Sequence, residues 1–88
     1  MHAVVLDDVH TLMSEVFTNQ HLFQDQEAHV MSMTLTQLMC AALKLKEGEH
    51  LQGQSLQNYK DVYDKMSVAL NAECSRRQKL EPRTHKER

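Results

Sequence analysis

Two stretches of the chain, on either side of a short loop that holds both glycines, carry apolar residues at helical spacing. These positions recur at alternating steps of three and four residues, which places them on one face of an α-helix. They are Ala28, Met31, Leu35, Leu38, Ala42 and Leu45 in the first stretch, and Leu56, Tyr59, Tyr63, Met66 and Leu70 in the second. Because the loop is short, we predict an antiparallel helical hairpin over about 26–46 and about 55–78.

Residues that favour helix ends flank both stretches. Asp25 or the residue after it can begin the first helix, and Gly48 is expected to stop it, because glycine suits the left-handed conformation beyond a helix. Ser55 is the N-cap candidate of the second helix, since its hydroxyl can accept a hydrogen bond from a free amide. Folding back about the loop pairs Leu45 with Leu56, Ala42 with Tyr59, Leu38 with Tyr63, Leu35 with Met66 and Met31 with Leu70.

A third apolar stripe predicts an N-terminal helix over about 8–18. The stripe consists of Val5, Val9, Leu12 and Val16. The segment between Phe17 and Asp25 has weak helix propensity but contains neither glycine nor proline, so it leaves two interpretations open. A turn there gives three helices, and this is our expectation; the alternative is one long helix over about 8–46.

Composition supports an all-α fold. Only four residues of the 88 are aromatic, although 41% are hydrophobic, and two glycines and one proline are too few for the turns of a β-sheet protein. We expect a helical domain over 1–75 and a basic, disordered tail over 76–88. Roughly 1.5 kcal/mol of conformational entropy per ordered residue would outweigh the burial of a lone hairpin. The hairpin and N-terminal helix should therefore pack as a three-helix unit or within a dimer.

Four apolar residues lie off the main stripes and are the candidate partner-binding residues: Leu22, Phe23, Val30 and Met33. Methionine adapts to irregular surfaces, and methionine-rich faces recur at binding sites that must repack. The predicted function is a non-enzymatic helical module for protein–protein interaction, such as an adaptor, a small chaperone or a regulatory subunit. We expect it to act as a homodimer or with a partner protein.

The alternative function rests on the last thirteen residues, "RRQKLEPRTHKER", which carry a net charge of +4. A basic segment of this kind can contact phosphate backbones without reading sequence, as in a small nucleic-acid-associated regulator. No aromatic residues interleave the basic ones, which argues against stacking on single strands. The candidate residues are Arg76, Arg77, Lys79, Arg83, Lys86 and Arg88.

Catalytic and metal-binding signatures are weak in the sequence. His21 and His29 are separated by about 12 Å along a continuous helix, too far to share one ion with Asp25. Cys40 reads as a packing residue and Cys74 as exposed, and their separation in the hairpin argues against a disulfide. With no phosphate-binding loop or catalytic motif, we expect no enzyme activity, no metal and no cofactor. No apolar run is long enough to cross a bilayer and no secretory signal is evident, so we expect a cytoplasmic protein.

Overall fold

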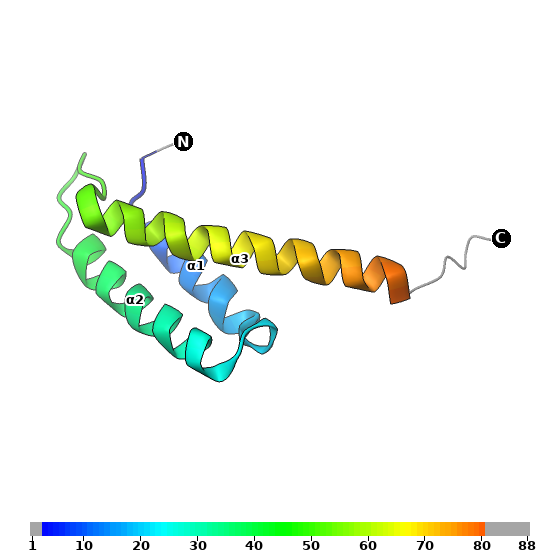
Figure 1. Cartoon of the computed structure of the whole chain (residues 1–88). Helices are drawn as coiled ribbons and strands as arrows, with labels where there is room; N and C mark the ends of the chain where they lie inside the picture. Colours follow the sequence, from blue (N-terminus) through cyan, green and yellow to red (C-terminus); the bar gives the residue numbers. More distant parts are fainter. Residues whose placement is uncertain (1–2, 81–88) are drawn as a thin grey trace.

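The computed structural model describes residues 3–80, which form three α-helices and no β-strand (Figure 1). The helices are α1 (Leu6–Thr18), α2 (Asp25–Leu43) and α3 (Gly53–Leu80), and the 3-10 helix η1 (Gln20–Leu22) lies between α1 and α2. The predicted all-α fold with three helices is confirmed. The helices pack as one small unit in which α1 contacts both longer helices.

The chain reverses between α1 and α2 without a glycine or a proline. The side-chain amide of Asn19 donates to the carbonyl oxygen of Glu15 at 2.9 Å, which satisfies an acceptor in the last turn of α1. The backbone amides of Leu22 and Phe23 then donate to Asn19 and Gln20, and these two bonds build η1. The predicted break is therefore correct, and the alternative of one long helix is wrong. His21 lies in η1, so it does not share a helix face with His29 in α2.

One core joins all three helices and two segments outside them. Its buried residues are Val4, Val9, Leu12, Val16, Met31, Leu35, Leu38, Ala42, Leu51, Tyr59, Val62 and Met66. Four residues of the first stripe, Met31, Leu35, Leu38 and Ala42, are buried as predicted, and Ala28 and Leu45 are half-buried. The α3 stripe is buried only in part, because Tyr63 is 49% exposed and Leu70 is also exposed. Val62 takes the buried place expected for Tyr63, since α3 packs against α1 as well as α2 and its buried face turns accordingly.

The N-terminal segment and the connecting loop close one end of the core. Val5 is exposed although it was predicted in the buried stripe, because it is the extended residue before α1 and helical spacing does not apply to it; Val4 is buried in its place. The backbone amide of Val5 donates to the carboxylate of Asp8 at 2.9 Å, which fixes the first turn of α1. Leu51 was not predicted as a core residue because it lies outside every helix.

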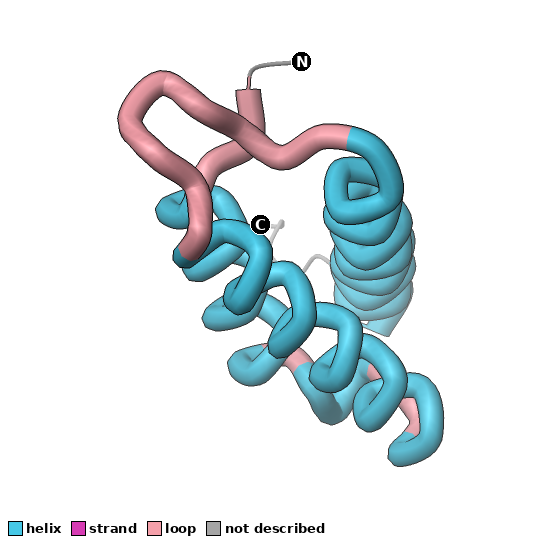
Figure 2. Tube along the Cα trace, turned by 90° about the vertical axis from the view of Figure 1, so that its left-hand side faces the viewer, coloured by secondary structure: helices cyan, strands magenta, loops and turns pink. Residues whose placement is uncertain are grey.

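Helix α2 ends five residues before the expected stop at Gly48. Gly48 instead lies inside a turn, where the amide of Glu49 donates to the carbonyl of Lys46 at 2.9 Å. Its φ of +86° fits the third position of a type II turn, a position that favours glycine. Ser55 lies inside the first turn of α3, so it is not the N-cap predicted for that helix. In the view along α3, the loop arches from the end of α2 to the start of α3 (Figure 2).

The molecule is elongated because α3 is much longer than its partners. Helix α2 and helix α3 lie closest near their connecting loop and diverge toward the start of α2 (Figure 1). The C-terminal part of α3 continues past the other helices and gives the molecule dimensions of 55 × 29 × 17 Å. The divergence is greatest beside the corner that joins α1 to α2 (Figure 1).

Candidate protein interface

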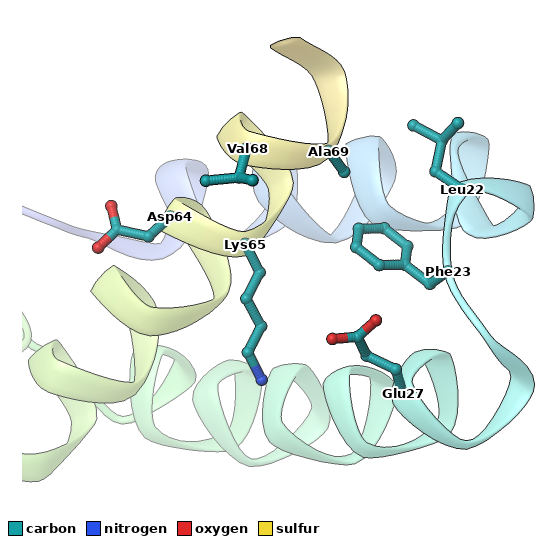
Figure 3. Close-up of a pocket in the computed structure, with 7 residues that line it drawn as sticks. All are labelled: Leu22, Phe23, Glu27, Asp64, Lys65, Val68 and Ala69. Carbon is teal, nitrogen blue, oxygen red and sulfur yellow. The ribbon is translucent and has the colours of Figure 1, made fainter. Parts of the chain in front are cut away.

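An apolar groove of about 370 Å³ opens beside this corner, between the start of α2 and the middle of α3 (Figure 3). Leu22 and Phe23 line it from the corner, and Val68 and Ala69 line it from α3. Leu22 and Phe23 are half-buried, so the corner packs against the core and still presents apolar surface. Val68 is 68% exposed, the largest exposure among the large apolar residues of the described chain.

Charged side chains form the rest of the groove wall: Glu27 from α2, and Asp64 and Lys65 from α3. The Lys65 side chain extends toward α2, and the Glu27 carboxylate lies beside the Phe23 ring (Figure 3). All three residues are exposed. An apolar floor with two acidic groups and one basic group at its edge suits a segment that carries apolar side chains next to a cation.

The four predicted partner-binding residues fall on two separate surfaces. Leu22 and Phe23 lie in the groove, whereas Val30 and Met33 lie on the outer face of α2, 49% and 53% exposed. Val68 and Ala69, which also line the groove, were not predicted from the sequence. The only available signal was that Val68, like Met33, is a large apolar residue off the main stripe of its helix.

A second, smaller hollow of about 290 Å³ lies where the loop meets the N-terminal segment. Its apolar wall comes from Val5, Leu6, Leu43 and Leu45, and the turn that contains Gly48 forms another side. The amide of Lys46 donates to the Glu49 carboxylate at 2.7 Å, so this turn is closed by its own side chain. A turn with its own internal hydrogen bond therefore forms one side of the hollow.

The basic residues at the end of α3 are partly paired within the helix. Arg76 donates to both oxygens of the Glu73 carboxylate, the closer at 2.7 Å, and Arg77 donates to it at 3.1 Å. The hydrogen bond from Arg76 is the main reason that the pKa of Glu73 lies below its ordinary value, with Arg77 adding to the effect. The side chain of Lys79, and Arg83, Lys86 and Arg88 altogether, lie outside the described residues.

Two tyrosines stack on α3, and the inner one, Tyr59, lies near acidic residues of α1. The Tyr59 and Tyr63 ring centroids are 6.0 Å apart, with an interplanar angle of 29°. Burial raises the pKa of the Tyr59 hydroxyl above 10, and the negative charge of Asp8 raises it further. The hydroxyl of Tyr59 is therefore held in its neutral form where α3 packs against α1.

The described residues offer little else that could carry chemistry. Cys40 is exposed on α2, so it does not pack in the core of the chain as predicted, and Cys74 is exposed as predicted. Within residues 3–80, no three His, Cys, Asp or Glu side chains are grouped as a metal site would require. None of the helices in this part of the chain is long and apolar enough to cross a membrane.

No protein family, curated protein or solved structure matches the chain. Its function is therefore inferred from its own surfaces.

Proposed function

We propose that this chain is a non-enzymatic helical module that binds another protein through the groove beside the corner between α1 and α2. The observation that carries this proposal is the convergence of Leu22, Phe23, Val68 and Ala69, from two distant parts of the chain, on one open apolar groove. Apolar surface of this kind costs free energy in water, and a binding partner would remove it from solvent. Adaptor, small chaperone and regulatory subunit are the roles that fit such a module.

The expected partner is a protein segment with one or two bulky apolar side chains next to an arginine or a lysine. The apolar side chains would fill the groove against Phe23 and Val68. The basic side chain would lie near Glu27 and Asp64, which outnumber the one cation, Lys65, at the groove edge. Recognition of an amphipathic helix by an apolar groove is a common mode of this kind.

A site-specific photo-crosslinker at position 68 tests the proposal in the native host. Val68 is mostly exposed, so its replacement by the crosslinking amino acid should leave the fold intact. The control carries the same crosslinker at Gln57, an exposed α3 residue about three turns earlier and outside the groove. We expect one defined protein adduct from position 68, its loss on Phe23→Asp in a chain that keeps its helicity, and no such adduct from position 57. Equal adducts from both positions would contradict the proposal.

A small nucleic-acid-associated regulator is the second candidate function. It would use the basic residues from Arg76 onward on phosphate backbones. The contacts between Glu73 and both Arg76 and Arg77 weigh against it, because they partly neutralise the described portion of the basic segment. Deletion of residues 81–88 combined with R76Q and R77Q should abolish DNA or RNA binding under this hypothesis and leave the photo-crosslinked partner unaffected.

A further inference from the structure

The outer face of α2 differs from an ordinary solvent-facing helix surface because it carries almost no charge. Residues 28–43, "AHVMSMTLTQLMCAAL", contain no Asp, Glu, Lys or Arg, although charged residues make up 25% of the chain. A surface helix usually places charged and polar residues opposite its buried stripe. Here the face opposite Leu35 and Leu38 instead exposes Val30, Met33 and Cys40.

Six of the exposed residues on and next to this face follow the spacing of a second helix-packing stripe. They recur at alternating steps of four and three residues, the rhythm with which one helix packs along another. The stripe, here called the outer stripe, consists of Gln26, Val30, Met33, Gln37, Cys40 and Lys44, all of them exposed. The same helix therefore offers one complete stripe to its own core and a second one to solvent.

We infer that the outer stripe of α2 packs against the outer stripe of a second copy of this chain, with the two helices antiparallel. Val30 of one copy then faces Cys40 of the other, and Met33 faces Gln37. A two-fold axis repeats each contact, so one stripe supplies both halves of the interface. The uncharged residues meet one another, and no charged side chain is buried at the centre of the interface.

The charges at the two ends of α2 select the antiparallel arrangement. Asp25 lies in the first turn, and Lys44, which belongs to the outer stripe, follows the last turn. Antiparallel pairing puts Lys44 of each copy beside the acidic first turn of the other copy and aligns the helix dipoles favourably. Parallel pairing would put like charges side by side. The outer stripe and the groove are different surfaces, so this inference does not depend on the proposed function.

Disulfide trapping tests both the partner and the register. Cys40 is native, and the test variant adds Val30→Cys and removes the other thiol with Cys74→Ser. Positions 30 and 40 of one helix are about 15 Å apart along its axis, too far for an internal disulfide. A disulfide between them therefore joins two chains, and we expect a dimer held by two such bonds after mild oxidation.

Two matched variants control for random collision. Cys74→Ser alone keeps only Cys40, and V30C/C40S/C74S keeps only the new thiol. In the inferred register the two copies of either single thiol lie about 15 Å apart, so both controls should remain mostly monomeric on a non-reducing gel. Absence of the dimer in the test variant, or equal dimer in all three variants, would overturn the inference.

Light scattering of the native chain provides a second measurement. The measured mass should rise from 10.2 kDa toward twice that value as the concentration increases, and Met33→Glu should hold it at 10.2 kDa with unchanged helicity. Val68→Glu makes the same change in the groove and should leave the self-association intact. A native chain that stays at 10.2 kDa throughout would overturn the inference. Absence of a defined partner adduct from the crosslinker at position 68, with dimerisation retained, would count only against the proposed function.

Discussion

The backbone amide of Leu51 donates a hydrogen bond to the carbonyl oxygen of Val4 at 2.8 Å. This bond joins the loop before α3 to the segment before α1, and both side chains are almost completely buried. The two segments cover the end of the core where the helices come closest together. The loop is therefore an integral part of the folded unit, because it supplies both a core side chain and a backbone contact to the N-terminal segment.

The substitution Leu51→Ala should lower the free energy of unfolding by about 3 kcal/mol, because it removes a buried side chain and leaves a cavity. Urea denaturation monitored by circular dichroism measures the change. Val68→Ala is the control, since Val68 is mostly exposed and its truncation should cost less than about 0.5 kcal/mol. Equal losses for the two variants would contradict the role assigned to the loop.

The substitution Gly48→Ala should destabilise the fold by about 1–2 kcal/mol, although no atom would clash with the added methyl group. The cost arises from the φ of +86°, which side chains of L-residues disfavour. Gly48→Asn should cost less, because asparagine tolerates the left-handed region better than alanine. Thermal unfolding of the two variants gives the comparison, and an alanine variant as stable as the native chain would argue against this turn.

Protonation of Glu73 should loosen the end of α3 at acidic pH. Its pKa is lowered from the ordinary 4.5 in the folded chain, so its contribution is present above that value and is lost as the pH falls through the lowered pKa. NMR titration of the Glu73 carboxyl carbon should give a midpoint below 4.5, and the backbone amides of residues 74–77 should shift together with it. R76Q/R77Q should return the midpoint toward 4.5; a midpoint unaffected by these changes would rule out the arginine contacts in solution.

Ionisation of Tyr59 should weaken the fold at alkaline pH. Its pKa is raised by burial and by neighbouring negative charge, so below pH 10 the phenol is neutral in both the folded and the unfolded chain. Above pH 10 the unfolded chain ionises first, and the free energy of unfolding falls as the pH rises. Thermal melts of the native chain and Tyr59→Phe should diverge above pH 10, with Tyr59→Phe losing less stability; parallel profiles would contradict the prediction.

The sequence was sufficient to predict the core face of α2, because Met31, Leu35, Leu38 and Ala42 keep the three-four spacing of one helix face, and all four are buried. The face of α3 was harder to assign. Val62 and Tyr63 are adjacent apolar residues, and a two-helix hairpin favours Tyr63 by spacing alone. Because α3 contacts α1 as well as α2, its buried face is turned toward Val62. The apolar spacing within α3 does not indicate which other helices pack against it.

The candidate groove was predictable only in part. The sequence indicates Leu22 and Phe23 as candidate partner-binding residues because they are large and apolar and lie between the predicted helices. Val68 lies more than forty residues away, and the contact of α3 with η1 brings it beside them. That contact depends on how three helices pack together, so the sequence could indicate one wall of the groove but not the other.

The unequal helix lengths have a practical consequence for hydrodynamic measurements. A compact chain of 88 residues would have a radius of gyration of roughly 12 Å, whereas this molecule has 16.2 Å because α3 extends past its partners. A single copy should therefore elute early from a gel-filtration column and resemble a heavier, rounder protein. Elution volume alone would indicate a dimer even for a monomer. The oligomeric state must therefore be determined from the measured molar mass and not from hydrodynamic size.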